Sequence, residues 1–205
     1  MITVSKLTVQ SHIPESFASY TFHPGTWTDA YSLASERQIK KNHLVTTIPL
    51  LMAQWKVSFE FKASTFGSGL LQLLHMTIGG RCSGGKSKYG DRTPAIWTHP
   101  TRGFLISSAV NGKFSYSRYF KKLPKTDEWI NIEVGQELDL GRMIYYIIIG
   151  GTKVFSITNT KPSEFKDVKV FTSSRWYSSL TGSIRNLLIQ NKDNGLYPQP
   201  PHKLD

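Results

Sequence analysis

The most constraining feature of the sequence is the stretch 129–157, WINIEVGQELDLGRMIYYIIIGGTKVFSI. Residues 130–134 alternate between apolar and polar, which is typical of a strand with one face in the core. After a polar turn comes 142–149, a run of β-branched and aromatic residues that is too short to favour a helix. Gly150 and Gly151 can adopt the positive φ angles of a tight hairpin turn, so the residues after them should return as a partner strand.

The predicted strand 142–149 is apolar on both of its faces. Such a strand needs cover on both sides, so we expect it in the centre of a sheet, beneath a second layer. The alternative is that one apolar face forms an interface between copies of the chain.

Other segments of the chain extend this pattern. Residues 55–62, WKVSFEFK, alternate aromatic and charged side chains and predict the clearest half-buried strand. Asn111-Gly112, between two strand-like runs, is a strong hairpin signal. Only 33–41, LASERQIKK, suggests a helix, and a strand or loop fits it equally well. Roughly ten to fourteen short strands at about 8–12-residue spacing predict an antiparallel all-β sandwich or barrel.

The length of 205 residues and the hydrophobic content of 39% suffice for a sizeable core. We expect a single β-sandwich domain over residues 1–190 and a Pro-rich tail or linker over 191–205. No apolar run reaches the roughly 20 residues of a membrane span. The first residues lack the apolar core of a signal peptide, which fits either a cytosolic chain or a mature secreted one.

The net charge of +11 is unevenly distributed. Segment 81–125 holds ten basic residues and a single acid, Asp91. This concentration favours a polyanionic partner, with a merely solvated face as the alternative. Because no RNA- or DNA-binding motif is present, we rank a sulfated or acidic glycan above nucleic acid. The basic residues expected to contact the ligand are Arg81, Lys86, Lys88, Arg92, Arg118, Lys121, Lys122 and Lys125.

The glycine-rich segment 80–87, GRCSGGKS, meets the pattern of a phosphate-binding P-loop. Such a site needs a helix N-terminus after the loop, and the residues that follow predict no helix. We therefore interpret the segment as a connection between strands. The single Cys82 excludes an intrachain disulfide and is either an incidental thiol or a reactive one beside Arg81.

The second half of the chain carries the motifs of a known fold family. Trp129 opens a strand, the hairpin 146–154 (YIIIGGTKV) follows, and Asn159 stands in the next turn. The last strands of that family are matched by 165–171 (FKDVKVF) and 182–187 (GSIRNL). The pattern resembles concanavalin A-like, laminin G-like jelly-roll domains, and it is similar to lectin-like modules of secreted invertebrate adhesion proteins. The resemblance covers residues 55–190.

This resemblance implies an all-β, antiparallel two-sheet jelly-roll sandwich that binds glycans, or glycan-bearing proteins, from a loop edge or a concave sheet. Laminin G-like domains often hold calcium at that rim through an acidic residue and backbone carbonyls. Asp91 lies in the basic segment, whose charge opposes a cation. We therefore expect no cofactor, with calcium as the alternative.

Retaining glycosidases on such a jelly roll place carboxylates at i, i+2 and i+4 of one strand, so that all project into one cleft. The nearest set here is Glu133, Glu137 and Asp139. Position 135 is Gly, and the last two acids fall in the predicted turn. The six histidines and one cysteine show no metal-ligand spacing. We therefore expect no catalytic site and no metal site.

Aromatic rings stack on the apolar faces of sugars, while carboxylates and guanidinium groups bind sugar hydroxyls. Trp97, Trp176 and Tyr177 lie beside turn-rich segments, and Asp91 and Arg92 precede the first of them. These five residues are the candidate sugar contacts, with burial in the core as the alternative for each aromatic.

We therefore predict a non-catalytic, lectin-like recognition module, extracellular and suited to cell adhesion, that binds carbohydrate or acidic (sulfated) glycoconjugates. One alternative is a structural domain that forms homo-oligomers through an apolar sheet face. The other is a glycan-active enzyme on the same fold, for which the sequence offers no acid–base pair.

Overall fold

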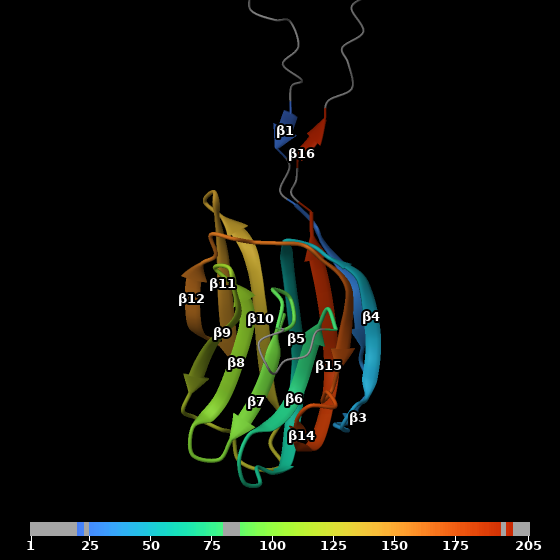
Figure 1. The fold of residues 1–205 in the computed structure, drawn as a ribbon, viewed down its shortest axis with the longest axis vertical. Coiled ribbons are helices and arrows are strands. Elements are labelled where there is room, and N and C mark those ends of the chain that lie inside the picture. Colours follow the sequence, from blue (N-terminus) through green and yellow to red (C-terminus); the bar gives the residue numbers. More distant parts are fainter. Residues whose placement is uncertain (1–19, 23–24, 80–86, 194–195, 199–205) are drawn as a thin grey trace, which may run out of the picture. The chain divides into compact units, whose positions relative to one another are not determined.

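The computed structural model describes residues 20–22, 25–79, 87–193 and 196–198 (Figure 1). Residues Thr26–Asp193 form one compact unit. A second unit comprises the two chain ends, in which β1 (Tyr20–Phe22) pairs antiparallel with β16 (Leu196–Pro198). The expected bounds of 1–190 for the domain and 191–205 for a tail stay a prediction, and the last long strand continues to Lys192.

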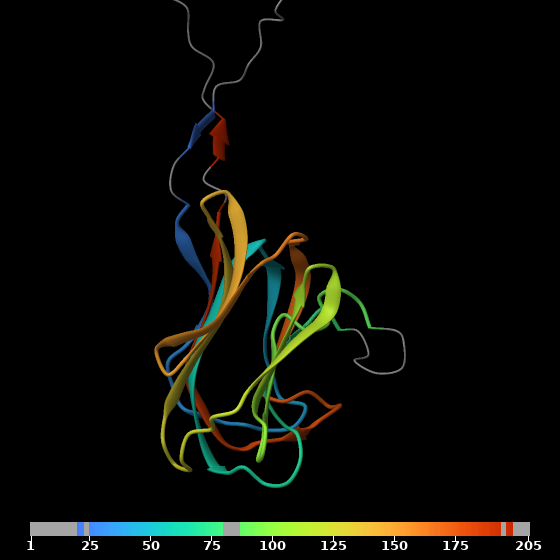
Figure 2. The ribbon, with the colours of Figure 1, turned by 90° about the vertical axis from the view of Figure 1, so that its left-hand side faces the viewer.

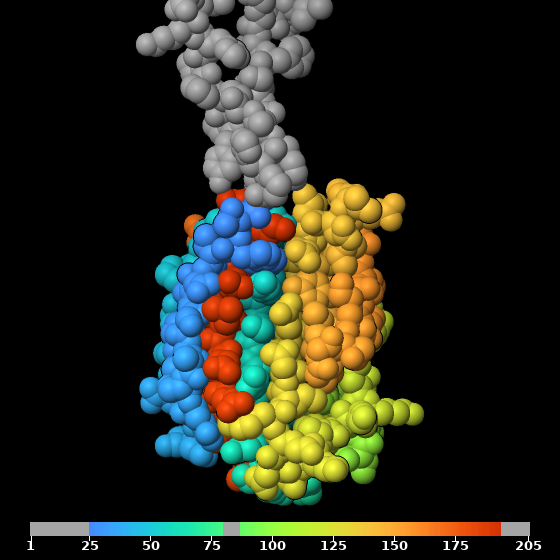
Figure 3. Space-filling view, turned by 180° about the vertical axis from the view of Figure 1, so that it is seen from behind, coloured from blue at the N-terminus to red at the C-terminus, as the bar shows by residue number. Residues whose placement is uncertain are grey.

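The first sheet of the larger unit has the strand order β12-β11-β10-β5-β15-β2, and β3 also pairs with β15. All of its strand pairs are antiparallel. Its described strands are β2 (Trp27–Leu33), β3 (Arg37–Gln38), β5 (Gln54–Thr65), β10 (Ile130–Asp139), β11 (Arg142–Ile149), β12 (Thr152–Thr158) and β15 (Thr181–Lys192). The side chains of its outer face lie in side-by-side stripes from β15, β5 and β10 (Figure 3).

The second sheet has the order β4-β13-β6-β7-β8-β9, and the short β14 pairs parallel with β6. Its described strands are β4 (Leu44–Leu51), β6 (Leu71–Thr77), β7 (Ala95–His99), β8 (Gly103–Val110), β9 (Lys113–Phe120), β13 (Phe165–Phe171) and β14 (Ser178–Ser179). Figure 2 shows the two sheets edge-on as two layers. The predicted all-β, antiparallel two-sheet jelly-roll sandwich is confirmed, and the described residues include no helix able to span a membrane.

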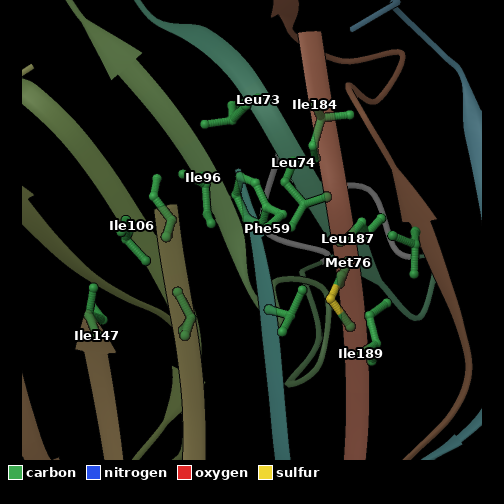
Figure 4. Close-up of a cluster of buried hydrophobic side chains, with 14 of the residues drawn as sticks. Phe59, Leu73, Leu74, Met76, Ile96, Ile106, Ile147, Ile184, Leu187 and Ile189 are labelled. Carbon is green, nitrogen blue, oxygen red and sulfur yellow. The ribbon is translucent and has the colours of Figure 1, made fainter. Parts of the chain in front are cut away.

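The core fills the space between the two layers (Figure 4). The alternation predicted for residues 55–62 is confirmed, because Val57, Phe59 and Phe61 of β5 are fully buried while the charged residues between them are not. From the second sheet, Leu74 and Ile96 point into the same cluster. This burial of large apolar side chains from both sheets is the main favourable term for the fold.

The stretch 129–157 forms the three expected strands β10, β11 and β12. The prediction that 142–149 lies in the centre of a sheet is wrong, because β11 is the second strand from the edge. Its inner face places Tyr145 and Ile147 in the core. On the outer face Tyr146 is 5% exposed and donates its hydroxyl hydrogen to Glu133 Oε1 at 2.9 Å, so a polar contact takes the place of a covering layer. An interface between copies through this face stays a prediction.

Two further predictions concern a turn and a possible helix. Asn111 and Gly112 have φ angles of 55° and 75° and join β8 to β9, so the predicted hairpin is confirmed. The helix considered for 33–41 does not form, because β3 occupies part of that segment. Ile39 is its only fully buried residue, and its backbone N–H donates to the Gly182 carbonyl at 2.9 Å.

Candidate functional site

Two loops cover part of the outer face of the second sheet. His75 and Trp97 point away from the core, because they alternate with core residues of β6 and β7. Gln72 reaches the same face through an irregularity in the pairing of β6 with β7 between Gln72 and Leu74, which leaves both Leu73 and Leu74 in the core. All three are fully buried. The sheet is therefore buried on both faces here, between the core and the loops 87–94 and 172–180.

The loop 172–180 is anchored on β6. Ser174 donates from its backbone N–H and from its hydroxyl to Gln72 Oε1, each at 2.7 Å. Trp176 then lies edge-on to the His75 ring, with 5.9 Å between the ring centroids. Tyr177 lies edge-on to Trp97 at 5.2 Å. These contacts fix the half-buried Trp176 and Tyr177 on the outside of the sheet.

The loop 87–94 is held by a hydrogen bond between its own residues, and it also contacts the loop 172–180. The buried Asp91 accepts the backbone N–H of Lys88 at its Oδ2 at 2.5 Å, and its carbonyl accepts Nε2–H of His75 at 2.8 Å. The next residue, Arg92, donates from Nη2 to the Tyr177 hydroxyl at 3.0 Å, and its guanidinium lies 5.1 Å from the centre of the Trp97 ring. Cation–π attraction and hydrogen bonding thus join the two loops.

His75 stands at the centre of this arrangement. Burial lowers the pKa of His75 from 6.5 to about 4, and the positive charge of Arg92 acts in the same direction, against the hydrogen bond to the Asp91 carbonyl. The imidazole is therefore neutral at pH 7, and its ring packs edge-on against Trp176.

Beside Trp176 the surface is hollowed into a cavity of about 190 Å³, which we call the cup. Its lining residues are Asn42, Thr77, Gly79, Lys169, Phe171, Arg175 and Trp176. Two of them are cations and two are aromatic, and no acid is among them. The Arg175 guanidinium lies 5.0 Å from the centre of the Trp176 ring. This is the composition expected of a small site for a ring that carries a negative charge.

Four of the predicted contacts, Asp91, Arg92, Trp97 and Tyr177, are brought together behind Trp176 rather than in the cup. Trp97 is not a loop aromatic, because it lies on β7 and is only 1% exposed beneath Arg92 and Tyr177. The buried Asp91 uses its carboxylate to hold the loop. These residues can act on a ligand only through the position that they give to Trp176.

The predicted basic residues that the structure describes lie on different elements. Lys88 is exposed in the loop 87–94, and Arg81 and Lys86 lie outside the described residues, as does Cys82. Arg118 lies on β9, the far edge strand of the second sheet, followed by Lys121, Lys122 and Lys125. Three strand spacings, roughly 14 Å, separate β9 from β6.

Sequence reasoning missed six of the seven lining residues of the cup, all except Trp176. Lys169 and Phe171 point outward from β13, opposite the buried Val168 and Val170. The alternation VKVF was a usable signal for the side on which they lie. Asn42 has a φ of 57°, and its approach to β13 depends on the path of the chain rather than on local sequence.

Comparison with known proteins supports the fold. No family model and no curated protein matches the chain. Among solved structures, the CBM40 of Ruminococcus gnavus IT-sialidase bound to α2,3 sialyllactose aligns with a TM-score of 0.51 and 12% identity, over 77% of this chain and 91% of that one. The same domain bound to α2,6 sialyllactose aligns with a TM-score of 0.51 and 11% identity, over 77% of this chain and 92% of that one. A SAP-like pentraxin of Limulus polyphemus aligns with a TM-score of 0.46 and 12% identity, over 83% of this chain and 74% of that one.

The chain therefore shares the jelly-roll sandwich of these domains, which confirms the concanavalin A-like part of the resemblance. At identities this low, the likeness concerns the fold alone. Among the described residues, no group of three His, Cys, Asp or Glu side chains is placed to hold a metal ion.

Proposed function

We propose that this domain is a non-catalytic carbohydrate-recognition module that binds an acidic sugar in the cup. The observation that carries the proposal is the position of the half-buried Trp176 beside Lys169 and Arg175, in a cavity whose lining within the described residues includes no acid. An extracellular, lectin-like role, as in laminin G-like adhesion modules, belongs to the same proposal.

The cup offers a distinct role to each of its groups. The Trp176 indole can stack on the apolar face of a sugar ring, while the Lys169 ammonium and the Arg175 guanidinium bind a carboxylate or sulfate. Asn42 adds an amide for sugar hydroxyls. The volume of about 190 Å³ is smaller than a typical drug-sized pocket, so we expect one acidic residue at the end of a glycan chain to enter.

The solved structures support this choice of ligand class. The CBM40 domain that shares this fold binds sialyllactose, whose sialic acid is an acidic sugar. We transfer only the class of ligand, because the cup is defined by residues of this chain.

Two of the three acidic residues considered for catalysis, Glu133 and Glu137, have structural partners. Glu133 accepts the Tyr146 hydroxyl at 2.9 Å, and Glu137 lies 3.7 Å from the Lys192 ammonium. Between them on the strand stands Gly135, whose missing side chain leaves room for the Tyr146 hydroxyl. These engagements favour binding over glycan hydrolysis.

The experiment is a titration of the full chain with α2,3 sialyllactose, a sulfated disaccharide and neutral lactose by calorimetry. We expect an acidic sugar to bind at least about tenfold more tightly than lactose, and its affinity to fall as salt is raised from about 50 to 500 mM. Equal affinity for lactose and both acidic sugars, or no binding to a folded sample at low salt, would falsify the proposal.

A further inference from the structure

A second cavity opens between the two sheets, at the side of the sandwich where β9 and β12 are the edge strands. We call it the edge groove, and its volume is about 550 Å³. Phe120 and Leu123 line it from the second sheet and the loop that follows. Ile130, Ile149 and Val154 line it from the first sheet. Its walls are therefore mainly aliphatic, whereas the cup is lined by two cations and two aromatic rings.

An irregularity in β12 shapes the groove. The pairing of β11 with β12 shifts between Ile147 and Ile148, so Val154 has no partner in the ladder between Lys153 and Phe155. Phe155 packs on the core, and Val154, although adjacent in sequence, faces the groove and remains 40% exposed. A bulge thus turns two consecutive apolar side chains toward the same side of the strand.

Positive charge surrounds the groove. Lys121 and Lys122 are exposed and belong to its lining, which includes no acidic residue. Arg118 points to the same side of β9 as Phe120, and its guanidinium lies 5.3 Å from the centre of the Phe155 ring. An apolar channel with cations at its mouth complements a molecule that has an apolar chain and an anionic end.

We propose that the edge groove binds a single-chain anionic amphiphile, specifically the acyl chain of a fatty carboxylate. The chain lies between Phe120, Ile149 and Val154, and the carboxylate is held by Lys121 and Lys122. The volume lies within the range of about 300–1,000 Å³ typical of sites for small organic ligands. The proposal is independent of the sugar site, because the two cavities share no lining residue.

The test uses a series of carboxylates below their micellar concentrations: octanoate, decanoate and dodecanoate, titrated into the full chain and followed by calorimetry. If the acyl chain is buried, each added CH₂ should tighten binding by about fourfold. Dodecanol, which lacks the charge, should bind more weakly than dodecanoate. A chain-length series with constant affinity would show surface charge binding only and would overturn the proposal.

Matched variants locate the ligand. Val154→Asp places a carboxylate in the groove at an exposed position, so it should abolish dodecanoate binding without unfolding the domain. The double variant Lys121→Gln, Lys122→Gln should weaken dodecanoate and leave dodecanol unchanged, whereas Lys166→Gln, exposed on β13, should change neither. Trp176→Ala should retain fatty-acid binding, so a failure of the groove and a failure of the sugar site can be told apart.

Two outcomes would assign the groove elsewhere. If Val154→Asp binds dodecanoate as well as the unmodified chain does, the groove is not the site. If phosphatidylglycerol vesicles bind in a manner that depends on Val154 while soluble dodecanoate does not bind, the partner is a membrane surface and the fatty-acid proposal is wrong.

Discussion

The Nη2 atom of Arg92 donates a hydrogen bond to the Tyr177 hydroxyl at 3.0 Å, across 85 positions of sequence. This contact joins the two loops that cover the outer face of the second sheet, and Trp97 lies beneath both residues. Because Tyr177 directly follows Trp176, the bond also sets the position of the aromatic wall of the cup. The geometry of the proposed sugar site therefore depends on residues that do not line it.

Tyr177→Phe tests this coupling. The variant keeps the ring that packs on Trp97 and removes only the hydrogen bond to a charged donor, so we expect a loss of about 1–3 kcal/mol in the free energy of unfolding in urea. Sugar affinity should fall several-fold, because Trp176 is less firmly held. Tyr119 lies on β9 of the second sheet and is 47% exposed. The matched variant Tyr119→Phe should therefore leave the free energy of unfolding and the sugar affinity unchanged. If Tyr177→Phe is destabilised but binds the sugar with unaltered affinity, the hydrogen bond between Arg92 and Tyr177 does not position Trp176 for binding.

Trp176→Ala should lower the affinity for the acidic sugar by about tenfold or more, because the stacking surface is lost. The double variant Lys169→Gln, Arg175→Gln should remove most of the salt dependence of binding while retaining the weak affinity of a neutral sugar. Calorimetry at two salt concentrations measures both effects. Retained salt dependence in the double variant would place the anion outside the cup.

The stability of the domain should fall in mild acid because of His75. Its pKa of about 4 in the folded state lies below the 6.5 of the unfolded chain, so the unfolded chain binds more protons between these two values. The free energy of unfolding should therefore decrease as the pH drops from 6.5 to 4, by about 3 kcal/mol, with no contribution from this group above pH 7.

His75→Gln provides the comparison for this prediction. Urea unfolding of both proteins at pH 7 and pH 4.5 gives the difference in pH dependence, which cancels the contribution of carboxylates common to both. The variant should lose less stability on acidification than the unmodified chain does. Parallel pH profiles would show that His75 is not the responsible group.

Gly135→Ala should destabilise the first sheet. A Cβ at this position would lie 2.8 Å from Lys56 Cβ, 2.9 Å from the Trp55 carbonyl oxygen and 2.9 Å from the Tyr146 hydroxyl. Because two of these atoms belong to backbone or a buried ring, we expect a cost of about 1–3 kcal/mol in thermal or urea unfolding. Ser156→Ala, exposed on β12, is the control and should be close to neutral. A neutral Gly135→Ala would show that the sheet relaxes at this point.

Asn159→Ala should remove a polar link between the sheets. The buried Asn159 donates from Nδ2 to Gln136 Oε1 at 2.8 Å, and its Oδ1 accepts the backbone N–H groups of Asn111 at 2.9 Å and Lys161 at 3.1 Å. Truncation leaves these groups without a partner, so we expect a loss of about 2–4 kcal/mol. Asn159→Asp should recover little of this loss, because its carboxylate keeps the acceptor but sets a buried oxygen against Gln136 Oε1. If both variants unfold like the unmodified chain, water replaces the amide fully.

Local sequence patterns were sufficient to predict several strands and turns of this protein. The alternation in β5 fixed which side chains enter the core, and Asn111-Gly112 fixed a hairpin, because the side-chain period of a strand and the positive φ of a turn are properties of neighbouring residues. The strand patterns predicted an all-β sandwich or barrel, and the resemblance to concanavalin A-like domains implied the jelly roll. For the segment 33–41 the local sequence left helix, strand and loop open, because the pairing of β3 comes from β15, far along the chain.

Only the tertiary structure decided where the sites lie. The order of the strands brings Arg92 to Tyr177 and places Trp176 beside Lys169, while it sends Lys121 and Lys122 to a different cavity at the edge of the sandwich. Residues that are distant in sequence thus meet in one site, because strand order is set by burial of the whole core rather than by any local pattern. The stretch 129–157 shows both effects. Its sequence pattern predicted the three strands, whereas the position of β11 next to the edge of the sheet depends on the strands that pair with it.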